Sequence, residues 1–220
     1  MVFNSMTFLI FFPIVTLIYF VFPKRVRYVW LLVASYYFYM SWNAKYAILL
    51  LISTVTTYIG GLIVGCFKKA NSTDKADVKS KITLGVCAFI NLGILFGFKY
   101  LDFALLIVGR ILQLIHISVS IPAFDILLPV GISFYTFQAI GYLVDVYRGD
   151  IPAEKNFLKY ALFVSFFPQL VAGPIERSSN LLSQIHIPTS FKIENARSGL
   201  LTMAYGLFLK IVIADNIDKR

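Results

Sequence analysis

The residues best suited to chemistry form a polar stripe inside a hydrophobic run in the second half of the chain. At steps of three, four and three positions, this run carries Tyr135, Gln138, Tyr142 and Asp145. That spacing places side chains on one face of a helix. Polar groups in a lipid-soluble helix are costly unless they face the protein interior or a water-filled cavity. The stripe therefore predicts an interior face, which either lines a substrate path or joins helices through hydrogen bonds.

Arg148 extends this stripe by one helical turn. It lies three positions after Asp145, a spacing at which an arginine and a carboxylate on one helix can pair. We therefore expect an ion pair at the end of the helix, beside an interior lining that includes Gln138 and Tyr142.

A broken hydrophobic segment follows, with the sequence FFPQLVAGPIER. Its two prolines and its glycine interrupt any helix, because proline lacks the backbone N–H that a helix requires. Backbone groups freed at membrane depth must be satisfied by protein, water or a ligand. Gln169 and Pro174 lie within the break, and Glu176 and Arg177 come directly after it. We expect a re-entrant segment that shapes the mouth of a site; the alternative is a structural kink that ends in a Glu176–Arg177 ion pair.

The composition is that of an integral membrane protein. Hydrophobic residues make up 59% of the chain, charged residues make up 14%, and the mean hydropathy is +0.78. In a soluble domain, by contrast, about a quarter of the residues are charged. The net charge of +9 would suggest a nucleic-acid partner for a soluble protein. Here the charges lie in short gaps between apolar runs, so we expect no nucleic-acid partner and assign the charges to membrane topology.

Uncharged runs in the first half of the chain predict membrane-spanning helices, at residues 1–23, 28–44, 46–67 and 82–98. The first run lacks the basic start and the cleavage site of a signal peptide, so it is expected to remain as a helix. The loops at residues 24–27 and 68–81 are basic, which predicts that both are cytoplasmic and that the N-terminus lies outside. We expect an all-α fold, a polytopic transmembrane helical bundle with broken or re-entrant segments.

The two histidines each stand outside any catalytic or metal-binding pattern in the sequence. His116 lies beside Arg110 and Gln113 in a run at residues 103–121 that either spans the membrane, lies in its interface or re-enters it. Its surroundings favour a packed or interfacial role. His186 lies in a polar stretch and is expected to face solvent or lipid headgroups.

The cysteines and the spaced glycines also favour structural roles. Cys66 and Cys87 lack the spacing of a metal site, so we expect free thiols and no bound metal. The pairs Gly61/Gly65 and Gly93/Gly97 each place two glycines on one helix face, which favours close helix packing within the bundle. No phosphate-binding glycine loop and no serine elbow is present in the sequence.

Two of these segments resemble a known family. The runs LPVGISFYTFQAIGYLVDVYRGDI and FFPQLVAGPIERSSNLL are similar to motifs of the membrane-bound O-acyltransferase family. The nearest part of that family is its bacterial polysaccharide-modifying branch, which is alginate O-acetyltransferase-like and D-alanyl transfer protein-like. The runs MVFNSMTFLIFFPIVTLIYFVFP, LLVASYYFYMSWN and LKIVIADNI also fit that branch, so the resemblance covers essentially the whole chain.

The resemblance implies an enzyme of the bacterial cytoplasmic membrane that crosses it several times. Such an enzyme moves an acyl group, usually acetyl, from a cytoplasmic thioester to a hydroxyl outside. The implied donor is acetyl-coenzyme A or an acyl carrier protein, and no bound cofactor is expected. An extracytoplasmic acetyltransferase is the implied partner protein.

The family's catalytic residue is an intramembrane histidine, and neither His116 nor His186 matches its position. The resemblance therefore implies that residues 1–220 are the N-terminal part of a single transmembrane domain, without a catalytic residue and inactive alone. A transporter or channel whose polar helix face lines the path is the main alternative, although no internal repeat supports it. A non-catalytic membrane scaffold is a third interpretation.

Overall fold

The computed structural model describes Phe3, Ile217 and residues 5–70, 74–100, 103–107, 129–170, 173–174, 176–187 and 189–214. Within these ranges all regular secondary structure is helical. The helices are α1 (Met6–Val21), α2 (Arg27–Met40), α3 (Tyr46–Ala70), α4 (Asp74–Lys99), α6 (Ile132–Arg148), α7 (Phe157–Ser165), α8 (Phe167–Leu170), α9 (Ser178–His186) and α10 (Ile193–Phe208), which continues as a π-helix over Leu209–Ala214.

Helix ends follow from local chemistry. Ser5 precedes α1, and its hydroxyl accepts a hydrogen bond from the N–H of Phe8 at 3.2 Å. Asn156 precedes α7, and its side-chain oxygen accepts from the N–H groups of Leu158 and Lys159. Both are side chains that satisfy free amides at a helix start. Gly149 ends α6 with φ of 84°, a conformation that glycine adopts without steric cost.

Among the described residues, three helices are long and apolar enough to cross a membrane: Tyr46–Lys68, Ala76–Lys99 and Ile193–Ala214, with 23, 24 and 22 residues. A bilayer core needs about 20 residues. The segments Met6–Val21 and Phe157–Leu170 are shorter apolar helices. The prediction of an all-helical membrane protein is therefore confirmed. Arg110, Gln113 and His116 lie outside the described residues.

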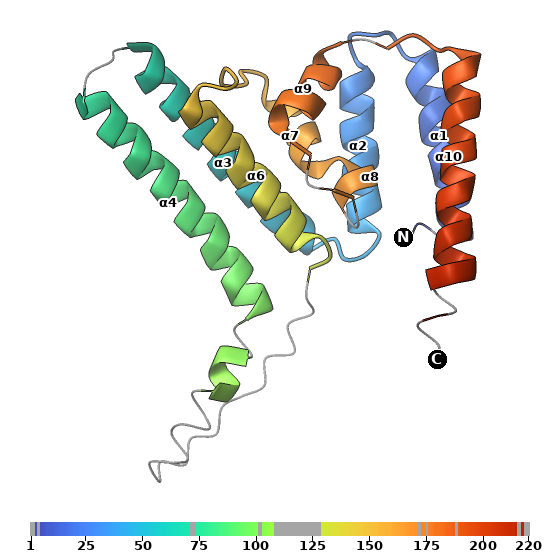
Figure 1. Cartoon of the computed structure of the whole chain (residues 1–220), viewed down its shortest axis with the longest axis horizontal. Helices are drawn as coiled ribbons and strands as arrows, with labels where there is room; N and C mark the ends of the chain where they lie inside the picture. The colour runs from blue at the N-terminus through green and yellow to red at the C-terminus, as the bar shows by residue number, and fades with distance from the viewer. Residues whose placement is uncertain are drawn as a thin grey trace.

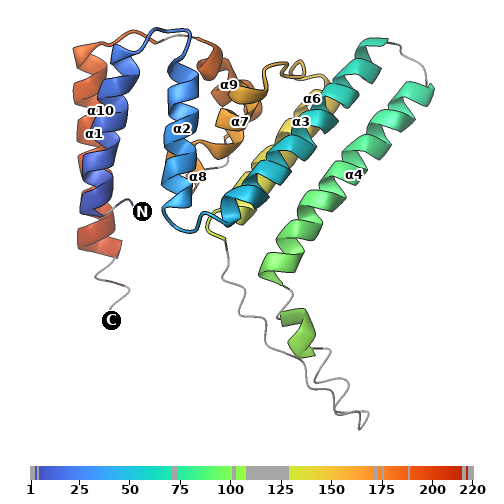
Figure 2. The ribbon, with the colours of Figure 1, turned by 180° about the vertical axis from the view of Figure 1, so that it is seen from behind.

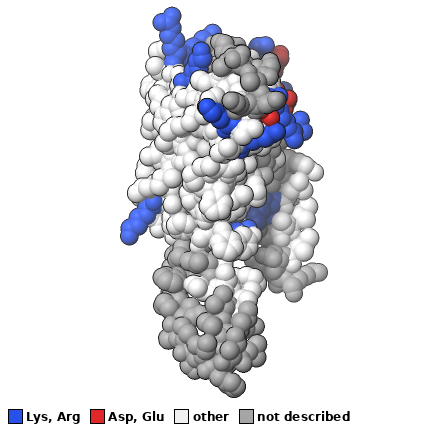
Figure 3. Space-filling model, turned by 90° about the vertical axis from the view of Figure 1, so that its left-hand side faces the viewer, with Lys and Arg blue, Asp and Glu red and all other residues white. Residues whose placement is uncertain are grey.

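The helices run alternately up and down, so that their links gather at two ends (Figures 1 and 2). α3 packs against α4 and α6, α2 packs against α7, and α1 packs against α2. The α1–α2 link, the end of α3 and the start of α4 all lie at the top of Figure 1, as the charge pattern predicted for loops on one side of the membrane. Lys and Arg side chains gather at this end (Figure 3), which we call the basic end.

The α3–α4–α6 packing depends on small and polar residues. An added Cβ at Gly61 would lie 2.7 Å from the Tyr142 ring of α6, and one at Gly65 would lie 2.7 Å from the Cβ of Ala153. The predicted role of this glycine pair in packing is therefore confirmed. An added Cβ at Gly93 or Gly97, in contrast, would meet no neighbouring atom within 4 Å in the described part of the chain.

A buried polar contact and two free thiols complete this part of the bundle. Ser53 of α3 donates a 2.5 Å hydrogen bond to Asn91 of α4, of the kind that joins helices within a membrane. Cys66 is exposed and Cys87 is buried, and both are free thiols, as predicted.

Candidate functional site

The predicted polar stripe of α6 faces the bundle interior. Tyr135 and Tyr142 are fully buried, Gln138 is 6% exposed and Asp145 is half-buried. Phe137, on the opposite face, is 47% exposed. The spacing therefore identified the interior face of this helix correctly, and the contacts of each side chain indicate what that face does.

α6 lies antiparallel to the segment formed by α7 and α8. The rings of Tyr142 and Tyr160 are 4.5 Å apart between centroids. Further along, the Gln138 side-chain amide reaches the carbonyl of Phe163 at 2.8 Å. At the end of α6 far from the basic end, Gly131 has φ of 76° and lies so close to Leu170 that an added Cβ would overlap its carbonyl oxygen. The two segments therefore face each other along the whole length of α6.

The helix break at Phe166 is satisfied by neighbouring protein. The N–H of Phe167 cannot close the ladder of α7, because the backbone leaves the helical conformation at Phe166. It donates instead to the hydroxyl of Ser35 in α2, at 3.2 Å. The Phe163 carbonyl, four positions earlier, is the acceptor this N–H would use in a continuous helix. Gln138 donates to that carbonyl, so its observed role is to join helices.

After the break the chain returns along α6. Leu170 lies beside Gly131, whereas the Ser178 hydroxyl at the start of α9 donates to a carboxylate oxygen of Asp145. Asp145 lies one turn before the end of α6, at the basic end. The segment from α7 to α9 therefore enters the bundle and returns to the same end, as the prediction of a re-entrant segment requires.

The predicted ion pairs are absent from the described residues. Arg148 is exposed and makes no ion pair with Asp145, which bonds Ser178 instead. An exposed pair gains little in water, so no strong force holds the arginine there. Glu176 accepts a 2.9 Å hydrogen bond from the Asn180 amide. Arg177 is exposed and precedes α9, so the alternative of a Glu176–Arg177 pair is wrong for the described structure.

The remaining predicted positions lie in the return segment. Pro174 is exposed, and the side-chain oxygen of Gln169 is buried without a hydrogen-bond partner among the described residues. The hydroxyl of Tyr135 is in the same state. A role for these residues in lining a substrate tunnel stays a prediction.

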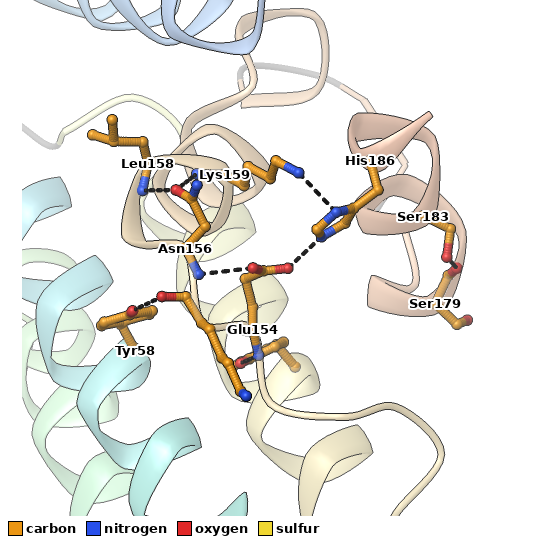
Figure 4. Close-up of polar contacts among 10 residues, drawn as sticks. Tyr58, Glu154, Asn156, Leu158, Lys159, Ser179, Ser183 and His186 are labelled. Carbon is orange, nitrogen blue, oxygen red and sulfur yellow. Dashed lines mark hydrogen bonds and ion pairs between the residues drawn. The ribbon is translucent and has the colours of Figure 1, made fainter. Parts of the chain in front are cut away.

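A second polar cluster, at the basic end, was missed from sequence (Figure 4). Glu154 is only 8% exposed, and its carboxylate accepts from the Asn156 N–H at 2.8 Å and meets the His186 Nε2 at 2.5 Å. Lys159 Nζ lies 2.8 Å from His186 Nδ1. Because an ammonium group only donates, Nδ1 accepts and Nε2 carries the proton donated to Glu154. We call these three residues the Glu–His–Lys cluster.

The cluster is tied directly to the polar stripe. The Glu154 N–H donates to the Tyr142 hydroxyl at 2.8 Å. Tyr58 of α3 donates to the carbonyl of Lys155 at 2.6 Å and fixes the same link (Figure 4). His186 is exposed, as predicted, but it also anchors the end of α9 to the start of α7.

A pocket of about 510 Å³ lies beside the cluster. His186 and Lys159 line it, together with Lys24, Arg25, Arg27 and Tyr28 from the α1–α2 region. None of the nine predicted site residues lines this pocket. No group of three His, Cys, Asp or Glu side chains that could hold a metal occurs in the part of the chain that the structure describes.

Comparison with known proteins identifies relatives of this chain among bacterial O-acetylases. It is 36% identical over 218 residues to the probable alginate O-acetylase AlgI of Azotobacter vinelandii and, over 218 residues, to that of Pseudomonas aeruginosa. It is 36% identical over 225 residues to the peptidoglycan O-acetyltransferase of Helicobacter pylori. The chain is a relative of bacterial O-acetylases. The resemblance to the polysaccharide-modifying branch of the membrane-bound O-acyltransferases is confirmed.

The alignments cover most of this chain but less than half of each relative. The alignments include 99% of this chain for both AlgI proteins and 89% for the peptidoglycan O-acetyltransferase. They include 42%, 40% and 39% of the three relatives, so the chain spans about two-fifths of their length. No family model matches the chain, and no solved structure matches it.

Proposed function

We propose that residues 1–220 form the N-terminal part of a membrane O-acetyltransferase that modifies a polysaccharide outside the cytoplasm. The observation that carries this proposal is the 36% identity to an alginate O-acetylase over 99% of the chain. A peptidoglycan O-acetyltransferase is related over 89% of it, so two different glycans occur among the names of the relatives. Acetyl transfer to a glycan hydroxyl is what those names share.

The proposed enzyme crosses the bacterial cytoplasmic membrane several times. The basic end faces the cytoplasm by the positive-inside rule, which supports a cytoplasmic thioester, acetyl-coenzyme A or an acyl carrier protein, as donor. The acceptor lies on the opposite side, where an extracytoplasmic acetyltransferase is the proposed partner.

The transfer breaks the carbon–sulfur bond of the donor and the oxygen–hydrogen bond of the acceptor. The acceptor oxygen bonds to the acyl carbon, and the hydroxyl proton passes by way of a base to the departing sulfur, which leaves as a thiol. The family resemblance assigns the base to an intramembrane histidine that neither histidine of this chain matches. The polar stripe and the re-entrant segment are supports for that site, because Gln138, Tyr142 and Asp145 each use their polar group to bond a neighbouring segment.

The test is acetyl transfer by the full-length protein in liposomes. Acetyl-coenzyme A or an acetylated carrier protein is supplied with a labelled acetyl group, and label on alginate or peptidoglycan fragments is measured. Transfer above protein-free liposomes is expected with at least one donor. Flux of solute through the liposomes with no acetyl transfer would favour a transporter and overturn the proposal.

A further inference from the structure

We propose that the pocket at the basic end is a binding site for a phosphate ester that carries an apolar or aromatic arm. Two molecules have this chemistry at a membrane surface: a phosphorylated thioester donor and an anionic phospholipid. The donor source rests on the proposed function, whereas the phospholipid source does not. The proposal concerns binding alone, so it can fail or succeed apart from acetyl transfer.

Charge is the first argument. Four of the lining residues are lysine or arginine, and no lining residue is aspartate or glutamate. Lys24 and Arg25 are exposed lining residues and form no ion pair among the described residues. Two cationic side chains next to each other over a concave surface attract an anion, and a phosphate is the anion that clusters of lysine and arginine bind best.

Arg27 also lines the pocket, but its guanidinium group is already hydrogen-bonded to protein carbonyls. Its guanidinium donates to the carbonyl oxygens of Phe22, Thr189 and Phe20 at 2.9, 2.6 and 3.2 Å. It thereby ties the end of α1 to the stretch that follows α9. These bonds fix the link that carries Lys24 and Arg25, both of which line the pocket.

The Glu–His–Lys cluster supplies a further, positioned cation to the pocket, Lys159. Lys159 donates one of its three N–H groups to His186, and its remaining donors are available to an anion. Glu154 is not among the lining residues, and its two oxygens accept from Asn156 and His186. The carboxylate therefore positions the lysine through His186, and an anion in the pocket would contact the lysine and not the carboxylate.

The rest of the lining suits an attached apolar or aromatic group. The lining also includes the apolar side chains of Leu31, Leu162 and Phe166 and the aromatic rings of Tyr19 and Tyr28. The volume of about 510 Å³ is within the roughly 300–1,000 Å³ of small-molecule sites. A ligand that combines a phosphate group with an apolar or aromatic arm therefore matches both kinds of side chain in the lining.

The experiment measures binding to the purified full-length protein in two arms. In the first, coenzyme A, dephospho-coenzyme A and pantetheine are titrated in neutral detergent by calorimetry. In the second, the protein is placed in nanodiscs of phosphatidylcholine with or without phosphatidylglycerol, and retained lipid is counted by native mass spectrometry. The variants are Lys159→Gln and the double variant Lys24→Gln with Arg25→Gln, and the control is Lys192→Gln, an exposed lysine outside the lining.

We expect each removed pocket charge to weaken binding of one phosphate probe by about fivefold and the control to change nothing. Loss in the coenzyme A arm identifies the donor as the source, and loss of retained phosphatidylglycerol identifies the lipid. No binding in either arm, or equal binding by pocket and control variants, overturns the proposal. Thermal unfolding in the same detergent shows that the variants are folded, and Lys24 and Arg25 are exposed enough to be replaced without loss of packing.

Discussion

The side-chain amide of Gln138 donates a 2.8 Å hydrogen bond to the carbonyl of Phe163, the group that the helix break at Phe166 leaves without its helical partner. On the other side of the break, the Phe167 N–H is satisfied by Ser35. Two side chains from two different helices thus replace one backbone bond. Because both backbone groups keep a hydrogen-bond partner, the broken helix can lie inside the bundle without the free-energy penalty of unpaired groups at membrane depth.

Replacing Gln138 by leucine is predicted to destabilise the full-length protein by about 1–3 kcal/mol, because the Phe163 carbonyl would be buried without a donor. Thermal and denaturant unfolding in detergent measures the change. Phe137→Leu, on the exposed face of the same helix, is the matched control and should change the free energy of unfolding by less than about 0.5 kcal/mol. Equal losses for both variants would contradict the assigned role.

The two buried tyrosines of the stripe are predicted to respond differently to loss of the hydroxyl. Tyr142→Phe leaves the N–H of Glu154 without its acceptor and should cost about 1–3 kcal/mol. Tyr135→Phe removes a hydroxyl that has no partner in the described structure, so it should be neutral or stabilising. Unfolding of the two variants side by side gives the comparison. A larger loss for Tyr135→Phe would contradict this prediction and indicate that its hydroxyl is paired, for which the neighbouring Tyr39 hydroxyl is the available partner.

Close packing of α3 on α6 predicts a strong effect at one glycine and none at another. Gly61→Ala would place a Cβ 2.7 Å from the Tyr142 ring, and overpacking of this kind costs roughly 1–3 kcal/mol. Gly97→Ala on α4 meets no atom within 4 Å and should be neutral or slightly stabilising, since alanine favours helix. The melting temperatures of the two variants distinguish these outcomes, and a reversed order would disprove the packing assignment.

Asp145 is predicted to matter for activity through its contact with Ser178. Asp145→Leu should lower acetyl transfer by the full-length protein about tenfold or more, because the start of α9 loses its anchor to α6. Asp145→Asn keeps an acceptor oxygen and should retain most of the activity. Val144→Leu, one position away and off the stripe, is the control. If Val144→Leu impairs transfer as much as Asp145→Leu does, the stripe has no functional face.

The local parts of this structure could be predicted from sequence, and the long-range parts could not. The steps between Tyr135, Gln138, Tyr142 and Asp145 fixed their common face, because helix geometry alone decides it. The prolines and the glycine likewise predicted the break in the apolar segment. Neither signal shows which residue satisfies the break, and Ser35 lies 132 positions away from Phe167.

The Glu–His–Lys cluster was missed for the same reason. His186 lies 32 positions from Glu154 and 27 from Lys159, and no local pattern joins them. They meet only because the chain turns back after α8 and returns to the basic end. The expected Asp145–Arg148 pair shows the reverse error: correct helical spacing does not hold two side chains together when one of them is in solvent.

The most direct test of the central claim is sided acetyl transfer in inverted membrane vesicles that contain the full-length protein. Labelled acetyl-coenzyme A, or a labelled carrier protein, is added outside, where the cytoplasmic surface is exposed, and the polysaccharide acceptor is enclosed within. The account predicts acetyl label on the enclosed polysaccharide and little label when the donor is enclosed instead. Absence of label on the polysaccharide with either donor, in vesicles shown to contain folded protein, would contradict it.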